Sequence, residues 1–211
     1  DTVVHPAGGA PHTFVAGPDG LDVLVFATGS DTHLTWLPRA NVMFAGSRWL
    51  PLDGPHPFRA EVDAGPLELG APEVDRPPHV VALDDVDPDE LRISDVAVVR
   101  RRLGAAAGAT RSGLSHLTVL PGRRSSLPHC HAAEEELFVV LDGSGLLELH
   151  ATDGASAGEH PVARGSLVAR PAGSGVAHSF VAGPDGLTVL AFSRTDLGDS
   201  LFYPRSQKVR V

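Results

Sequence analysis

The sequence has little cysteine and no long apolar run. Its 211 residues include one cysteine, Cys130, so no disulfide can form within the chain. Disulfides are rare in reducing compartments, so the lack of an internal disulfide leads us to expect a cytoplasmic protein. No apolar stretch approaches the ~18 residues of a membrane span, and no signal peptide is visible. The chain begins with Asp1 rather than methionine, which leaves the true N-terminus open.

A basic surface is also missing. The chain has 17 Lys and Arg residues against 26 Asp and Glu, a formal net charge of −9. Residues 51–95 hold 12 acidic and 3 basic residues, whereas the rest of the chain holds 14 of each, so the whole excess lies in that segment. Nucleic-acid binding needs clustered positive charge. We therefore expect neither nucleic acid nor a membrane as a partner.

What the sequence does contain is typical of an all-β protein. Glycine and proline are frequent, with 23 and 18 residues, while hydrophobic residues make up 42% of the chain. After residue 95, short segments rich in Val, Leu and Phe alternate with turn residues such as "DGSG" and "GPDG". This pattern predicts a compact antiparallel barrel or sandwich of about eight strands in residues 96–211. The predicted strands are 115–120, 135–141, 145–150, 166–170, 177–182 and 187–192.

Nearly the same fifteen residues occur twice. "HTFVAGPDGLDVLVF" begins at His12 and "HSFVAGPDGLTVLAF" at His178, and residues 12–39 share 14 of 28 positions with residues 178–205. This indicates an internal duplication. The N-terminal copy, residues 1–50, corresponds only to the second half of the C-terminal unit, with strands expected at 2–5, 13–16 and 21–27. Half a barrel leaves open sheet edges, so we expect lost residues, the neighbouring domain or a second chain to complete it.

A proline-rich acidic segment separates the two copies. Eight prolines fall between positions 51 and 88, and proline removes a backbone donor and interrupts regular structure. We therefore expect residues 51–95 to be an extended surface linker, with at most a short helical turn beginning at Asp87-Pro88. Three parts follow: a partial unit in 1–50, a linker in 51–95 and a complete domain in 96–211.

The pattern with most chemical content is "PHCHAAEEELFVVLDGSG", residues 128–145. In an extended chain, residues i and i+2 face the same side, so His129 and His131 point one way and Cys130 the other. Two imidazoles spaced in this way suit a metal, and Glu136 brings a carboxylate to the same face. We expect Cys130 to have a packing role.

The strand that follows Glu136 is apolar on both faces. By alternation Phe138 and Val140 point inward, while Leu137, Val139 and Leu141 point outward. A strand of this kind is covered on both sides. We therefore expect the outer face to meet another chain or the N-terminal piece, which favours a homodimer or an intimate two-domain particle.

Residues 121–145 resemble the first cupin motif, G-x5-H-x-H-x3,4-E-x6-G. His129, His131, Glu136 and Gly143 fit its spacing, whereas Gly122 lies one residue too far upstream. Residues 165–180, "GSLVARPAGSGVAHSF", resemble the second motif, G-x5-P-x-G-x2-H-x3-N. Its glycine, proline and histidine are present as Gly165, Pro171 and His178. Two extra residues separate Pro171 from Gly175, and Ala182 replaces the closing Asn.

The resemblance implies a double-stranded β-helix with a metal in its mouth, bound by His129, His131, Glu136 and His178. It also explains the repeat, because two-domain members, the bicupins, exist. His12 matches the last ligand, but the N-terminal copy lacks a His-x-His, so we expect about one metal per chain, in the C-terminal domain only. Three imidazoles and a carboxylate suit one divalent transition metal, with Fe or Mn favoured and Ni, Co or Zn also suitable.

Two functions remain open at this point. In the first, the protein is a metal-dependent enzyme that acts on a small organic molecule. The predicted interior is apolar and no further acid or base is evident beside the ligands, so dioxygenase-like oxidation is favoured over isomerisation. In the second, the protein is a non-enzymatic small-molecule binder in which the metal is structural. Fold alone does not choose between them.

Overall fold

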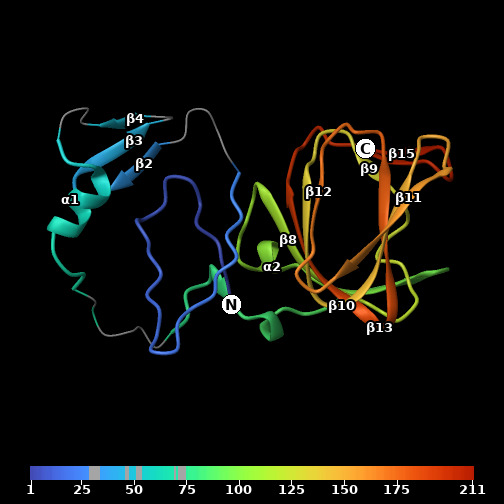
Figure 1. Cartoon of the computed structure of the whole chain (residues 1–211), viewed down its shortest axis with the longest axis horizontal. Helices are drawn as coiled ribbons and strands as arrows, with labels where there is room; N and C mark the ends of the chain where they lie inside the picture. The colour runs from blue at the N-terminus through green and yellow to red at the C-terminus, as the bar shows by residue number, and fades with distance from the viewer. Residues whose placement is uncertain (29–33, 46–47, 51–53, 69, 71–74) are drawn as a thin grey trace. The chain divides into compact units, whose positions relative to one another are not determined.

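The computed structural model of the chain describes residues 1–28, 34–45, 48–50, 54–68, 70 and 75–211. These residues form two compact units, each described by itself. Unit 1 comprises Asp1–Val4 and Arg76–Val211, and unit 2 comprises His5–Asp75. In Figure 1 the strands of residues 112–194, drawn from yellow-green to orange-red, curl around a common interior. No helix among the described residues is long and apolar enough to cross a membrane.

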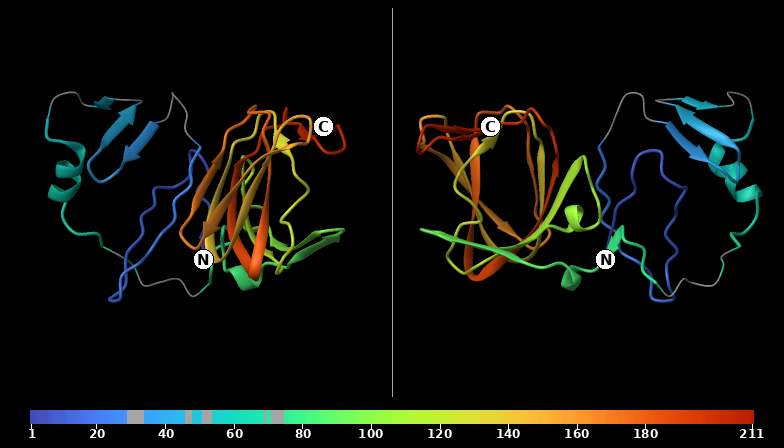
Figure 2. Two further views of the ribbon diagram at one scale, coloured as in Figure 1. Left: turned by 45° about the vertical axis from the view of Figure 1, so that its right-hand side comes forward. Right: turned by 180° about the vertical axis from the view of Figure 1, so that it is seen from behind.

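Unit 1 is built almost entirely from antiparallel strands, which Figure 2 shows from two further sides. Its largest sheet has the order β11-β10-β13-β8-β7-β6, and β12 pairs with β10 as well. A small sheet has the order β15-β14-β9, and β1 pairs with β5. The bounds are β1 (Thr2–Val3), β5 (Val80–Val81), β6 (Asp89–Ile93), β7 (Val96–Arg101), β8 (Ser112–Val119), β9 (Cys130–His131), β10 (Glu136–His150), β11 (Ser156–Ala163), β12 (Leu167–Arg170), β13 (Ala177–Arg194), β14 (Leu201–Tyr203) and β15 (Lys208–Arg210), with a 3-10 turn η1 (Leu83–Asp85) and a short helix α2 (Leu103–Ala106).

The core of unit 1 confirms the predicted alternation along 136–141. Phe138 and Val140 are 5% and 1% exposed, whereas the outward Leu137, Val139 and Leu141 are only half-buried. Phe138 packs edge-to-face on Phe180, with ring centroids 5.1 Å apart. Such pairs contribute about 0.5–1.5 kcal/mol beyond the burial of their area. The all-β double-stranded β-helix expected from the sequence is therefore confirmed. The second chain expected against the outer face of β10 stays a prediction.

Two segments expected to be turns are bends within continuous strands. The turn residues "DGSG" and "GPDG" were expected to separate strands, but β10 and β13 run through them. The ladder between the two strands shifts register twice, at Val140/Asp142 and at Gly143/Gly145. Such bulges bend a strand and raise its twist. The turn residues therefore curve the barrel wall and do not reverse the chain.

Gly143 shows why this bend needs glycine. Its φ is +75°, and a Cβ at this position would lie 2.3 Å from the carbonyl oxygen of Gly186 on β13. Both the left-handed backbone and the close approach of the two strands exclude any larger residue. The second glycine of the first cupin-like motif thus has a structural reason at this position.

The sequence analysis missed strand β11 and part of the structure before residue 96. β11 is polar and contains Pro161, which a central strand does not tolerate, but β11 lies at the edge of the sheet, where proline is accepted. The segment expected to be a linker carries α1 (Pro57–Asp63), β5, η1 and β6. β6 pairs with β7 along its whole length, so residues 89–93 belong to the sheet of unit 1 and are not linker. The short helical turn lies at Leu83–Asp85 and not at Asp87-Pro88.

Unit 2 contains a small antiparallel sheet and one helix. The sheet has the order β2-β3-β4, formed by Leu34–Leu37, Val42–Ala45 and Arg48–Leu50, and α1 follows it. The strands expected at 13–16 and 21–27 are not formed; this prediction was wrong. The one expected at 2–5 is β1, which pairs with β5. Whether residues 1–50 are a partial cupin unit stays a prediction.

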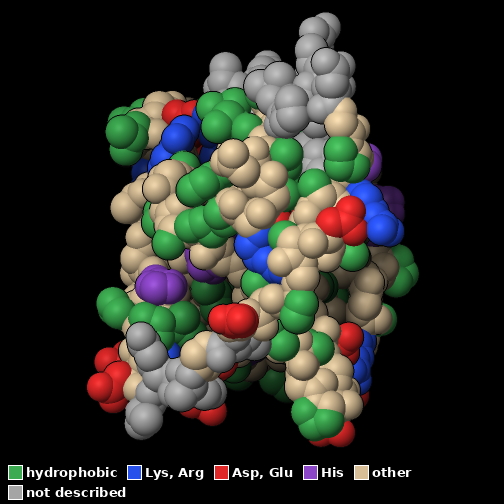
Figure 3. Space-filling model, turned by 90° about the vertical axis from the view of Figure 1, so that its left-hand side faces the viewer, with side chains coloured by type: hydrophobic (Ala, Val, Ile, Leu, Met, Phe, Trp, Pro, Cys, Tyr) green, Lys and Arg blue, Asp and Glu red, His purple; other side chains and the backbone are tan. Residues whose placement is uncertain are grey.

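The two copies of the repeat differ because their strand partners differ. In the C-terminal copy, β13 lies between β10 and β8, which satisfy its backbone groups on both sides. Among the described residues, 12–28 belong to no strand and form an isolated β-bridge between Gly17 and Gly20. Six large apolar side chains within residues 12–28 are therefore exposed: Phe14, Val15, Leu21, Val23, Leu24 and Val25. In Figure 3, hydrophobic side chains likewise reach the surface at several places on the face shown.

Candidate metal centre

Three neighbouring elements bring the four predicted ligands together. His129 directly precedes β9, His131 ends β9, Glu136 begins β10 and His178 is the second residue of β13. The backbones of His129 and His178 exchange two hydrogen bonds, with N···O distances of 3.3 and 2.9 Å. This bridge fixes the segment of the His-x-His against the strand that carries the last histidine, although 49 positions separate the two residues.

The side chains converge on one carboxylate oxygen. Oε2 of Glu136 lies 3.6 Å from Nε2 of His131 and 3.3 Å from Nε2 of His178. The His129 ring lies 5.2 Å from that of His131 and 5.3 Å from that of His178, measured between centroids. Ligand atoms of His129, His131 and Glu136 all lie within 4.8 Å of one another; His178 is outside that mutual group but adjoins Glu136. The four residues thus form one cluster, and their role as ligands remains a prediction.

Burial keeps two imidazoles of this cluster neutral and makes a charge on its carboxylate unfavourable unless a cation is bound. It lowers the pKa of His129 and lowers that of His178 well below the ordinary value. It also raises the pKa of Glu136 to about 7. Oε2 of Glu136 is buried and has no hydrogen-bond partner among the described residues. Neutral imidazoles offer lone pairs, and an orphaned carboxylate oxygen is costly unless a cation or donor meets it. The residues present therefore fit a divalent metal.

Asp199 orients one of these imidazoles, and the sequence analysis missed it. Its Oδ2 lies 2.6 Å from Nδ1 of His131, while Oδ1 accepts hydrogen bonds from the backbone N–H groups of Ala133 and Glu134. Burial alone would raise the pKa of Asp199, but these hydrogen bonds lower it below the usual range. An ionised carboxylate only accepts, so Nδ1 of His131 carries the proton and Nε2 is free to bind a metal. Asp199 follows His131 by 68 residues, and no local sequence pattern indicates that the two side chains meet.

His129 is oriented in the same way by the backbone. Its Nδ1 lies 2.8 Å from the carbonyl oxygen of Leu127, which leaves Nε2 free. The Tyr203 ring lies 5.8 Å from the His129 ring, and so closes one side of the cluster. Glu134 accepts a hydrogen bond from the N–H of Asp196 and lies 3.8 Å from Nδ1 of His131. It therefore supports the loop of Asp199.

A second, polar residue beside the cluster was also missed. Arg170 ends β12, and its Cα is paired with that of Glu136 on β10. The sequence carried a signal for the position of Arg170. Residues i and i+2 of a strand project from the same face, so Arg170 shares the face of Val168 on β12. Arg170 is therefore a charged side chain beside the ligands that the sequence analysis did not identify. Cys130, on the opposite face of β9, is 8% exposed, and burial raises the pKa of its thiol.

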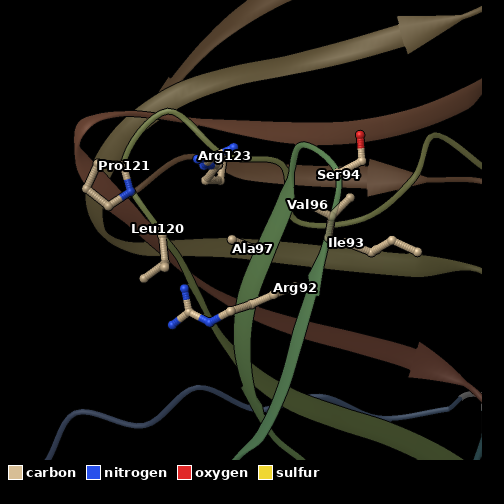
Figure 4. Close-up of a pocket in the computed structure, with 8 residues that line it drawn as sticks. All are labelled: Arg92, Ile93, Ser94, Val96, Ala97, Leu120, Pro121 and Arg123. Carbon is tan, nitrogen blue, oxygen red and sulfur yellow. The ribbon is translucent and has the colours of Figure 1, made fainter.

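A separate hollow of about 460 Å³ lies away from this cluster. It is lined by the ends of β6 and β7 and by the turn after β8, and Figure 4 shows Arg92 and Arg123 among its side chains. Arg92 is paired with Glu90 at 3.1 Å. The hollow has no histidine or carboxylate in its lining. Because it offers no set of ligands or acid–base groups, we place the candidate site at the histidine cluster.

Comparisons with known proteins agree with the fold. No family model matches the chain, and no curated protein matches it. A solved structure named as a sugar phosphate isomerase from Acidithiobacillus ferrooxidans aligns with a TM-score of 0.55 and 24% identity, over 63% of this chain and 85% of that one. A second, a sugar phosphate isomerase from Silicibacter pomeroyi described as a cupin-superfamily protein, aligns with a TM-score of 0.50 and 26% identity, over 59% of this chain and 80% of that one. The chain therefore has the cupin fold, and its structural neighbours are proteins of the cupin superfamily.

Proposed function

We propose that the protein is a metal-dependent cupin enzyme that acts on a small organic molecule. The observation that carries this proposal is the convergence of two imidazole Nε2 atoms on the orphaned Oε2 of Glu136, with His129 beside them. His129, His131, Glu136 and His178 would hold one divalent transition metal, with Fe or Mn favoured. When bound, the metal would supply Lewis-acid or redox chemistry at positions that the protein leaves open.

The chain's own residues prepare this chemistry. Asp199 and the carbonyl of Leu127 hold His131 and His129 in the tautomer that presents Nε2. Phe138 packs against the His178 ring, with centroids 5.3 Å apart, and Phe180 lies behind Phe138. These apolar rings exclude water below the cluster, which strengthens every electrostatic interaction there.

Two reaction classes are candidates. The apolar interior supports dioxygenase-like oxidation, the class that the sequence favours. Isomerisation is supported by the likeness to the Silicibacter pomeroyi sugar phosphate isomerase, and by Arg170 beside the ligands. Oxygen consumption by the Fe(II)-loaded protein and deuterium exchange into sugar phosphates followed by NMR distinguish the two. A loaded protein that shows neither activity towards a panel of small organic acids and sugar phosphates favours the non-enzymatic alternative.

Metal content is the first test. We expect about one divalent metal per chain by elemental analysis after loading, and less than a tenth of that in the double variant His129→Ala/His131→Ala. The matched control is His150→Ala/His160→Ala, which removes two histidines from β10 and β11 of the large sheet, outside the cluster. Equal metal in the wild type and the first double variant would contradict the assignment. Metal that proves to be bound by the four side chains alone, and whose removal unfolds unit 1, would support a structural role instead.

A further inference from the structure

Arg170 lies on the interior face of the barrel wall, next to Glu136. β12 pairs antiparallel with β10, with Glu136 opposite Arg170 and Phe138 opposite Val168. Residues directly opposite each other in such a pair project from the same face, with Cβ atoms about 4.5–5.5 Å apart. Phe138 is in the core and Val168 packs against that core, so this face is the inner one. Arg170 therefore projects inward at the level of the metal cluster.

The guanidinium of Arg170 is only partly satisfied. One terminal N–H₂ group donates to the carbonyl oxygen of Val176 at 2.7 Å, which ties β12 to the loop before β13. Its Nε is buried and has no hydrogen-bond partner, and no carboxylate lies within 4.0 Å of the guanidinium, in the part of the chain that the structure describes. A half-buried positive charge without an ion pair is unfavourable unless something else meets it.

The nearest acid attracts Arg170 through space but forms no close ion pair with it among the described residues. Glu136 is the carboxylate opposite Arg170, but its Oε2 faces the Nε2 atoms of His131 and His178. In the proposed function this oxygen binds the metal. Arg170 is thus left with free donors beside a metal that has open positions. Guanidinium groups present their N–H donors in a planar fork that matches the oxygens of a carboxylate or a phosphate.

We propose that the small molecule bound at this site carries an anionic group, a carboxylate or a phosphate, that pairs with Arg170. This inference rests on the proposed function, because it assumes a metal held by Glu136 and the three histidines. Arg170 then determines specificity: an uncharged analogue leaves its donors unmatched in a partly buried place. A divalent metal held by one carboxylate and three neutral imidazoles would also attract an anion, so the effect of substituting Arg170 carries the inference, and the preference for anions alone does not.

The experiment measures anion binding to the Co(II)-loaded full-length protein through its visible absorption. The probes are glycolate, inorganic phosphate and glycolamide, the last being a neutral analogue of glycolate. The variants are Arg170→Gln, which removes the charge, and Arg170→Lys, which keeps the charge but not the planar fork. Arg164→Gln is the matched control, because Arg164 is exposed on the turn between β11 and β12. Cobalt content and thermal unfolding are measured for every variant.

We expect glycolate or phosphate to bind at least tenfold more tightly than glycolamide, and the stronger of the two identifies the group. Arg170→Gln should weaken that binding by roughly 10- to 100-fold, as loss of a charge-assisted hydrogen bond does. The anion affinity of Arg170→Lys should lie between those of Arg170→Gln and the wild type, and that of Arg164→Gln should equal the wild-type value. All variants should have the same cobalt content. Equal binding by Arg170→Gln and wild type, or no preference for the anions, overturns the inference while the metal site stands. A wild type that retains no cobalt overturns the proposed function, and this inference with it.

Discussion

Replacing Asp199 by Asn tests whether the metal centre depends on the tautomer of His131. The substitution is nearly isosteric. Oδ1 still accepts from the N–H groups of Ala133 and Glu134, at 2.8 and 3.1 Å in the native chain. Only the atom that faces Nδ1 of His131 changes, from a carboxylate oxygen at 2.6 Å to an amide N–H₂ group. Two donors cannot share a hydrogen bond, so Nδ1 must become the acceptor and the proton moves to Nε2.

The magnitude follows from the role of that atom. Nε2 of His131 lies 3.6 Å from Oε2 of Glu136 and is the nitrogen that would bind the metal. A protonated Nε2 has no lone pair for it, so binding requires either the unfavourable tautomer or a rotated ring. Loss of such an orienting carboxylate typically weakens metal affinity by about 10–100-fold, which corresponds to roughly 1.4–2.8 kcal/mol.

The assay is competition for Zn(II) or Co(II) against a chromophoric chelator at pH 7.5. Asp196→Asn is the control, since Asp196 lies in the same loop and its Oδ1 caps Gly198 without facing a histidine. We expect the control to bind metal as the wild type does, and thermal unfolding of both metal-free variants to stay close to that of the wild type. An Asp199→Asn protein with unchanged metal affinity would refute the reasoning, because His131 would then need no orienting carboxylate.

Three further predictions concern the frame of the site. Phe180→Ala should lower the free energy of unfolding by about 3–5 kcal/mol, because removing a side chain that is 1% exposed leaves a cavity in the core. Urea denaturation measures this free energy. A loss under 1 kcal/mol would contradict the packing described. Gly143→Ala should destabilise the protein far more than Gly165→Ala. Both residues have a positive φ, but only at Gly143 would the Cβ meet a backbone atom, at 2.3 Å. Similar unfolding midpoints for the two variants would contradict a close approach of β10 and β13. In the metal-free protein, Glu136 has a pKa of about 7 against 4.5 in the unfolded chain, so the folded state binds more protons and stability falls as the pH rises through this window. Glu136→Gln should remove this loss and be more stable than the wild type by about 3 kcal/mol at pH 8, but not at pH 4; urea unfolding at both pH values with chelator present checks it, and a pH-independent difference would rule it out.

The candidate ligands and the inward faces of their strands could be predicted from the sequence. The period of two in an extended chain places His129 and His131 on one side, and Phe138 and Val140 inside, before any tertiary contact is known. Motif spacing added Glu136 and His178, and the structure brings all four side chains together. Alternation along the chain suffices for His129, His131, Phe138 and Val140, whereas His178 was expected only from the resemblance to the second cupin motif.

Tertiary structure alone decided which residues support that site and which repeat becomes a strand. Asp199 reaches His131 only because β14, which follows it, pairs with β9. The "GPDG" segment bends within β13 and does not turn the chain, because β10 holds the residues on both sides of it. Almost the same fifteen residues form a buried strand at 178–192 and no strand at 12–26. A strand's backbone groups are satisfied by its neighbours and not by its own residues, so sequence identity could not make the two copies alike.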